Sequence, residues 1–138
     1  SYSPLIGVKI RASSSPYLID EYPILSIAAS QAKGSTVMEG LSELRHKESD
    51  RIKSITTNLS KLGFQVNLKK DNISIQGNKN IKITKPMKIK TYSDHRIAMS
   101  FVILGLLYDN NLIIDDEACI SISYPNFKEH LEKLSALY

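Results

Sequence analysis

Two kinds of apolar pattern alternate along this chain, and their order restricts the fold more than any other feature. Some segments alternate apolar and polar residues as a strand does, and others space their apolar residues as a helix does. The order is strand, helix, strand, helix and two strands, then helix, strand and helix, which is typical of an α/β fold. We expect strands at 5–10, 35–38, 64–68, 73–75, 112–114 and 118–123, and helices at 23–34, 48–62, 97–108 and from 125 onward.

Lysines are concentrated between residues 77 and 90, where apolar residues also alternate with polar ones. This segment is either an extended edge strand that its lysines protect from further pairing, or a long loop. The wider set of lysines is not interleaved with aromatic side chains on which bases stack, which disfavours nucleic-acid binding. That set consists of Lys69, Lys70, Lys79, Lys82, Lys85, Lys88 and Lys90.

The composition of the 138-residue chain is that of a globular protein, with 23% charged and 42% hydrophobic residues. We expect residues 1–138 to form one domain or part of one. The net charge of +4 suits an acidic small-molecule substrate and also weak nucleic-acid affinity, so it favours neither. The single cysteine, Cys119, excludes an internal disulfide, and the spacing of His46, His95 and His130 does not suggest a zinc site. We therefore predict no metal site.

No apolar run reaches the roughly 18 residues that span a bilayer, and no signal peptide is recognisable. We therefore expect a cytoplasmic protein. The sequence opens without a methionine, in what reads as the middle of a strand, so we expect it to be a piece of a longer protein.

The most charged stretch, residues 43–52, leads directly into the second predicted helix. Seven of its ten side chains can carry charge, and the apolar residues that follow keep helical spacing up to Gly63. The N–H groups and dipole at a helix N-terminus favour anions. Glu48 and Arg51 are three residues apart and therefore neighbours in the first turn, where a proton carrier beside a cation suits a phosphate or carboxylate substrate. The alternative is a solvated capping turn.

Two other predicted helices begin in a similar way. One follows Asp20, and the other follows Ser93, Asp94, His95 and Arg96, where Ser93 or Asp94 is the expected N-cap. If the strands lie side by side, the three helix starts can converge on one rim of the sheet. The arginines and helix dipoles would then form an anion site, and the carboxylates would face it as proton carriers. Taken singly, each group is more simply a helix cap.

Four motifs together are more specific than any single pattern. They are Asp-Glu-Tyr-Pro at 20–23, the run at 43–52 with its Lys-Glu-Ser-Asp-Arg centre, residues 94–99, and residues 123–127. In this order and at these spacings, the chain resembles the C-terminal part of the 5-enolpyruvylshikimate 3-phosphate synthases over nearly its whole length. The resemblance implies an inside-out α/β barrel, with repeated βαβαββ units in two domains and the active site in the cleft between them. This chain would form most of the C-terminal domain.

The resemblance implies two catalytic carboxyl groups. Asp20 matches the carboxylate that contacts the shikimate ring and is proposed to take the proton from the attacking 5-hydroxyl. Glu48 matches the carboxyl that delivers a proton to the methylene carbon of phosphoenolpyruvate. Addition followed by elimination of phosphate needs a base, an acid and charge neutralisation, and it needs neither a metal nor a redox cofactor.

The resemblance also implies four substrate-binding residues. Lys47 matches a lysine at the shikimate phosphate side of the cleft. Arg51 and Arg96 match the two arginines that clamp the phosphoenolpyruvate anion, and His95 lies beside them. An arginine fork suits carboxylate and phosphate oxygens, and its charge persists at any working pH.

The chain departs from the family pattern at one position. Many members carry a lysine shortly before the tyrosine- or phenylalanine-proline motif, where it reaches the phosphoenolpyruvate phosphate, whereas residues 120–123 contain none. Either another cation such as Lys128 replaces it, or this member binds that phosphate less tightly. The first domain's own substrate-binding lysine, arginines and serines are also missing. We therefore expect shikimate 3-phosphate and phosphoenolpyruvate as substrates of a monomeric enzyme whose N-terminal domain is needed, and an inactive isolated fragment.

Three other interpretations stay open. The related transferase that acts on a UDP-sugar typically uses a cysteine in its other domain, and its counterpart lacks the Lys-Glu-Ser-Asp-Arg run. RNA-processing relatives share a similar barrel unit, so a basic nucleic-acid-binding domain is the alternative from another class. The third is a stable fragment without catalytic activity.

Overall fold

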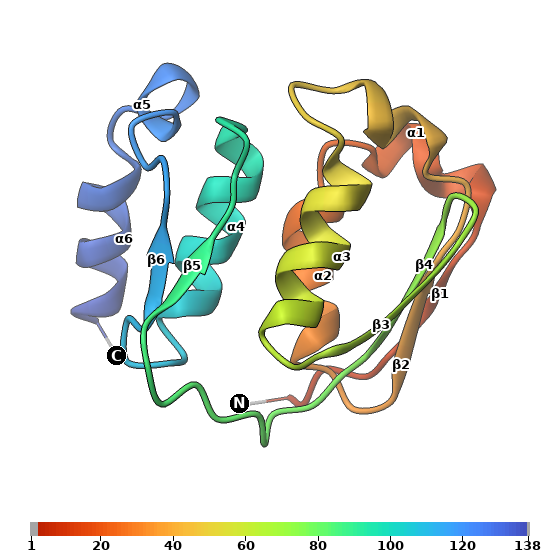
Figure 1. Ribbon diagram of the computed structural model, residues 1–138, viewed down its shortest axis with the longest axis horizontal. Helices are drawn as coiled ribbons and strands as arrows, with labels where there is room; N and C mark the ends of the chain where they lie inside the picture. Colours follow the sequence, from red (N-terminus) through yellow and green to blue (C-terminus); the bar gives the residue numbers. More distant parts are fainter. Residues whose placement is uncertain (1–2, 138) are drawn as a thin grey trace.

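The computed structural model describes residues 3–137, which form two β-sheets with helices between them (Figure 1). The four-stranded sheet lies at the right of this view and the two-stranded sheet at the left. Helices α2 (Tyr22–Ser30), α3 (Arg51–Lys61) and α4 (His95–Gly105) lie between them. The predicted α/β fold is therefore confirmed, but within residues 3–137 the two sheets do not join into a closed barrel.

The four-stranded sheet is built from one βαβαββ unit. Strand β1 (Lys9–Ile10) pairs in parallel with β2 (Ser35–Met38), and β2 pairs antiparallel with β4 (Asn72–Gln76). β4 forms a hairpin with β3 (Gln65–Lys69), as the alternating patterns predicted. The helices α2 and α3 connect the strands, and short helical turns precede them at η1 (Ala12–Ser14), α1 (Ser15–Leu18) and η2 (Ser42–His46).

The two-stranded sheet belongs to a second strand–helix–strand arrangement. Strands β5 (Met87–Ile89) and β6 (Leu112–Ile114) pair in parallel, with α4 as the connection. The lysine-rich segment therefore combines both expected alternatives, because a loop leads into the short strand β5. Helices α5 (Ile120–Ser123) and α6 (Phe127–Ser135) follow β6. In the described part of the chain, no helix has the length and apolar character needed to cross a membrane.

A common core joins the two sheets through α2, α3 and α4, and it includes Tyr22, Ile27, Ile52, Ile55, Leu59, Ile97, Ala98 and Phe101. A polar contact adds to this packing. The buried side chain of Asn58 on α3 donates to the carbonyl of Lys90 at 2.8 Å and accepts from its N–H at 3.1 Å. This pair of hydrogen bonds ties α3 to the chain just after β5, and so fixes α3 relative to the start of α4.

The structure corrects four of the expected boundaries. Residues 118–123, expected as a strand, contain the short helix α5, because Asp116 accepts a hydrogen bond from the Cys119 N–H and starts a helical turn. α3 begins at Arg51 and not at residue 48, since Asp50 is its N-cap. α2 ends at Ser30, before the expected end near residue 34, and the first strand is limited to β1. Gly63 does follow α3 with a φ of 99°, as predicted.

Candidate active site

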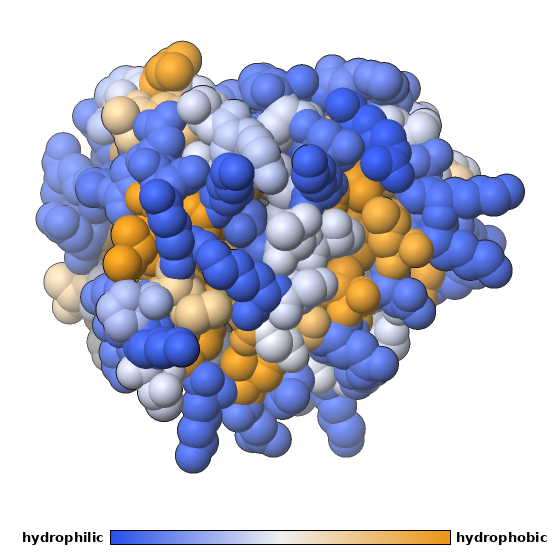
Figure 2. Space-filling view, in the orientation of Figure 1, coloured by the Kyte–Doolittle hydropathy of each residue, from blue (hydrophilic) through white to orange (hydrophobic). Residues whose placement is uncertain are grey.

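The N-terminal ends of α2, α3 and α4 meet at one edge of the molecule, the upper edge in Figure 1. In the same orientation, Figure 2 shows mainly hydrophilic residues along this edge. Arg96 at the start of α4 donates from Nη1 to the carbonyl oxygen of Asp20, just before α2, at 3.0 Å. Arg51 at the start of α3 donates to the Asp20 carboxylate. The three helix starts thus converge on one rim, as the sequence suggested.

Arg51 is the centre of this rim, with three carboxylates around one guanidinium. Its Nε lies 2.9 Å from Asp94 Oδ2, its Nη1 lies 3.0 Å from Asp20 Oδ1, and its Nη2 lies 2.6 Å from Glu48 Oε2. Only 1% of the Arg51 side chain is exposed. The ion pair of Glu48 with Arg51 was expected from their spacing. The burial of the guanidinium was not, because its partners Asp20 and Asp94 are distant in sequence.

Asp94 has two functions in this arrangement. As the N-cap of α4, it accepts from the Arg96 and Ile97 N–H groups, at 3.0 and 3.5 Å. It also accepts from Arg51 and from the Ser49 hydroxyl, the latter at 2.8 Å. Burial alone would raise the pKa of Asp94, but these donors hold it below its ordinary value. Asp94 is therefore a buried anion whose charge is compensated by several donors. The sequence predicted its capping role, but the expectation that it also faces a bound anion as a proton carrier is wrong, because its side chain is 0% exposed.

Asp20 is a half-exposed carboxylate surrounded by cations. Besides Arg51, Lys47 Nζ lies 3.4 Å from Asp20 Oδ1. Burial acts to raise the pKa of Asp20, but Lys47, Arg51 and Arg96 together lower it. The group is thus ionised at neutral pH, as a proton acceptor must be.

Glu48 and Asp20 share the two terminal nitrogens of Arg51. Glu48 lies just before α3 and is 51% exposed, and Asp20 is 44% exposed. Two carboxyl groups are therefore fixed side by side on one buried guanidinium while both remain accessible to a solute. This geometry suits a pair of proton carriers that act on one bound molecule.

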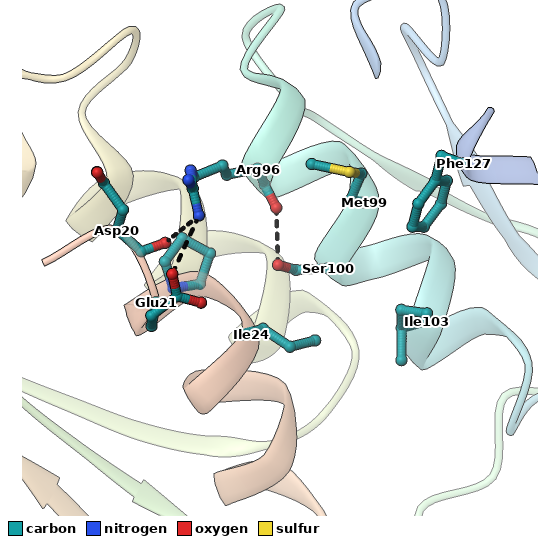
Figure 3. Close-up of a pocket in the computed structure, with 9 residues that line it drawn as sticks. Asp20, Glu21, Ile24, Arg96, Met99, Ser100, Ile103 and Phe127 are labelled. Carbon is teal, nitrogen blue, oxygen red and sulfur yellow. Dashed lines mark hydrogen bonds and ion pairs between the residues drawn. The ribbon is translucent and has the colours of Figure 1, made fainter. Parts of the chain in front are cut away.

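Arg96 is the accessible arginine of the rim, with 37% of its side chain exposed. Beside it is a hollow of about 230 Å³ between α2 and α4. Figure 3 shows Arg96 directed toward Asp20 and Glu21 at one end of this hollow, and Met99, Ile103 and Phe127 at the other. The hollow is thus polar at the rim and apolar farther in.

The N-termini of α3 and α4 are already capped by side chains, whereas α2 has no side-chain cap. The Asp50 side chain accepts from the Lys53 N–H of α3, and Asp94 occupies the N–H groups of α4. Each of Lys47, Arg51 and Arg96 also has a carboxylate partner. An anion can therefore reach Lys47 and Arg96, which are 28% and 37% exposed, whereas to bind Arg51 it must displace a carboxylate. Because α3 and α4 are already capped, their dipoles contribute less than the sequence suggested.

Comparison with known proteins defines the family. The sequence model described as EPSP synthase (3-phosphoshikimate 1-carboxyvinyltransferase) matches residues 3–131. The chain belongs to the EPSP synthase family. The 3-phosphoshikimate 1-carboxyvinyltransferase of Petrotoga mobilis is 47% identical over 135 residues, which are 98% of this chain and 31% of that protein. The enzyme of the same name from Aquifex aeolicus is 47% identical over 127 residues, which are 92% of this chain and 29% of that protein.

Solved structures of EPSP synthase agree with this membership. The 2.37 Å structure from Acinetobacter baumannii superposes with a TM-score of 0.81 at 34% identity, covering 94% of this chain and 30% of that one. This chain thus spans about 30% of the length of these EPSP synthases.

Two residues expected from the EPSP synthase resemblance, His95 and Lys128, form no side-chain hydrogen bond or ion pair with the other residues of the rim in the described part of the chain. His95 is the first residue of α4, and within residues 3–137 its side chain has no hydrogen bond or ion pair. Lys128, the candidate for the missing family lysine, pairs with Glu117 and lines other hollows than the one beside Arg96. In this structure Lys128 is therefore not directed at the rim.

Within residues 3–137 the structure has neither a cluster of metal-ligating side chains nor an exposed thiol. Within residues 3–137, no group of three or more His, Cys, Asp or Glu side chains could hold a metal ion. Cys119 is buried, and burial together with Asp116 raises the pKa of its thiol. The thiolate that acts as a nucleophile is therefore disfavoured.

Proposed function

We propose that this chain is part of a longer, two-domain enzyme of the shikimate pathway, called the complete enzyme below. The enzyme transfers the enolpyruvyl group of phosphoenolpyruvate to the 5-hydroxyl of shikimate 3-phosphate and releases phosphate, a step toward the aromatic amino acids. The observation that carries the proposal is the pair of accessible carboxyl groups, Asp20 and Glu48, held on the buried Arg51 beside Arg96. The names of the relatives support it.

The two carboxyl groups have distinct tasks in this reaction. Asp20 accepts the proton of the 5-hydroxyl while the oxygen attacks C2 of phosphoenolpyruvate, and Glu48 delivers a proton to C3. Loss of phosphate from the resulting tetrahedral adduct regenerates the double bond. C3 returns its proton to Glu48, and the phosphate leaves with the proton that Asp20 accepted. The ionised state of Asp20 at neutral pH suits the acceptor role.

The cations of the rim neutralise the substrates. Arg96 is the accessible guanidinium and makes first contact with the phosphoenolpyruvate carboxylate, with His95 adjacent. Lys47, 28% exposed, faces the phosphate of shikimate 3-phosphate. Arg51 is buried and contacts three carboxylates. It can therefore bind phosphoenolpyruvate together with Arg96 only after its contact with Asp20 or Glu48 breaks.

The remainder of the complete enzyme supplies what this chain lacks. Residues 1–138 are a partial C-terminal domain, and the preceding polypeptide completes an inside-out barrel and provides the facing wall of the cleft. From the resemblance alone, we propose a monomeric cytoplasmic enzyme.

Phosphate release by the complete enzyme tests this function. Release must require both shikimate 3-phosphate and phosphoenolpyruvate, and a UDP-sugar must not replace the former. Arg96→Ala is expected to raise the KM for phosphoenolpyruvate by about tenfold or more, the effect of losing a charge-assisted contact. Lys85→Ala, which removes an exposed charge from the loop before β5, is the control. No release with both substrates, or equal release with a UDP-sugar, would exclude the function.

A further inference from the structure

A buried ion pair connects the two halves of the rim. Arg51 opens α3 of the four-stranded unit, and Asp94 caps α4 of the second unit. Their side chains are 1% and 0% exposed. Two contacts join them, Nε to Oδ2 at 2.9 Å and Nη2 to Oδ1 at 3.3 Å. Since water does not reach this pair, its geometry is set by protein atoms alone.

The shape of the guanidinium makes this contact directional. A guanidinium is planar and rigid, so fixing its Nε edge also fixes where Nη1 and Nη2 point. In Arg51 these two nitrogens hold Asp20 at 3.0 Å and Glu48 at 2.6 Å. The positions of both accessible carboxyl groups thus depend on the contact that Asp94 makes.

Asp94 is itself held from several directions. Ser49 donates to it, and its own N–H donates to the Thr91 carbonyl at 3.1 Å. Thr91 is anchored by its N–H and hydroxyl to Asp115 Oδ1, at 3.0 and 2.7 Å. Between Thr91 and Asp94 the backbone has positive φ at Tyr92 and Ser93, 54° and 56°, a conformation that ordinary side chains disfavour. Such a conformation persists only where surrounding contacts enforce it.

We propose that Asp94 is a positioning residue that acts through Arg51 to fix the catalytic carboxyl groups Asp20 and Glu48. Asp94 does not touch substrate, being fully buried behind the guanidinium. Its role in turnover depends on the proposed transferase function, whereas its control of Arg51 does not.

Asp94→Asn in the complete enzyme tests the proposal, because asparagine still caps α4 but loses the charge that holds Arg51. We expect kcat to fall by roughly 10- to 100-fold, the scale of a small misplacement of reacting groups. The KM for phosphoenolpyruvate should rise by a smaller factor, because Arg51 also belongs to its clamp, and the KM for shikimate 3-phosphate should stay nearly unchanged. The Arg51 Nε–H, followed by NMR, should lose its protection from solvent exchange. Ser49→Ala, a milder variant, should change both quantities in the same direction by a smaller amount.

Asp50→Asn is the matched control, since Asp50 caps α3 but its carboxylate faces Arg45, outside the rim. It should leave kcat and Arg51 exchange unchanged. Retained Arg51 protection in both Asp94→Asn and Ser49→Ala would overturn the proposal, as would an equal loss of kcat in the control. If the wild-type enzyme releases no phosphate, the transferase function fails, and the Arg51 exchange measurement alone decides the positioning role.

Discussion

Replacing Arg51 by leucine should destabilise the 138-residue chain strongly. With Arg51 and Asp94 only 1% and 0% exposed, removal of the guanidinium leaves Asp94 as an unpaired buried charge. Breaking a buried pair in this way costs about 3–5 kcal/mol. Asp20 and Glu48 are 44% and 51% exposed, so water can replace Arg51 there, and each loss adds at most about 1 kcal/mol. Urea unfolding at neutral pH should therefore show a fall of at least about 3–5 kcal/mol in the free energy of unfolding, mostly due to Asp94.

The pH dependence of this loss distinguishes the mechanism. In the wild type the pKa of Asp94 is lowered by folding, so its stabilisation is present above the unfolded pKa, about 3.9, and is lost as pH falls through the folded value. Without Arg51 the pKa of Asp94 in the folded protein rises, because burial raises this pKa and the main group that lowers it is gone. In the Arg51→Leu variant, protonation of Asp94 at low pH removes the unpaired buried charge. The difference in the free energy of unfolding between the wild type and the variant should therefore become smaller in acid.

A double variant and two outcomes complete this test. Arg51→Leu combined with Asp94→Asn should recover a large part of the lost stability, because a neutral asparagine still caps α4. A loss below about 1 kcal/mol for Arg51→Leu alone would mean that the pair behaves as a surface ion pair. An equal loss at neutral and acidic pH would show that the charge of Asp94 is not the cause. Either result would refute the reasoning.

Three further expectations follow from single features. The Tyr22 hydroxyl is buried without a hydrogen-bond partner in residues 3–137, so Tyr22→Phe should raise the free energy of unfolding by about 1 kcal/mol or more. The control is Tyr108→Phe, which removes a hydrogen-bonded hydroxyl and should not raise it. Ser93→Gly relieves a left-handed backbone and should stabilise by up to about 1 kcal/mol in the same assay; destabilisation would mean that the serine side chain contributes unseen contacts. The 138-residue chain should fold alone yet release no phosphate from the two substrates, and saturable turnover by the chain would show that it holds a complete site.

Patterns within one element were sufficient to predict much of the fold. The helical spacing that ends at Gly63 located α3, and the alternation on either side of residues 69–72 located the hairpin. The prediction was wrong at 118–123, where apolar and polar residues alternate but Asp116 starts a helical turn. In such a short segment, a single side-chain hydrogen bond can decide between helix and strand. The alternation of apolar and polar residues does not reveal that bond.

The sequence indicated that the three helix starts would lie together, but not how their side chains bond to one another; the roles of these residues stay predictions. The three-residue spacing of Glu48 and Arg51 indicated their contact, which the structure has at 2.6 Å. The contact of Arg51 with Asp94 joins residues 43 apart, so no local pattern could indicate it. Nor could the sequence show that the arginine would be buried, since its burial depends on how α3 and α4 pack.

The turnover of a Glu48→Gln complete enzyme tests the central claim most directly, because glutamine keeps the shape of the side chain but carries no acidic proton. We expect both substrates to bind and phosphate release to fall by roughly 100-fold or more, the scale for a positioned proton carrier. Glu43→Gln, an exposed glutamate in η2, makes the same chemical change and should leave turnover unchanged. Near wild-type turnover of Glu48→Gln would contradict the account and leave Glu48 as an ion-pair partner of Arg51 alone.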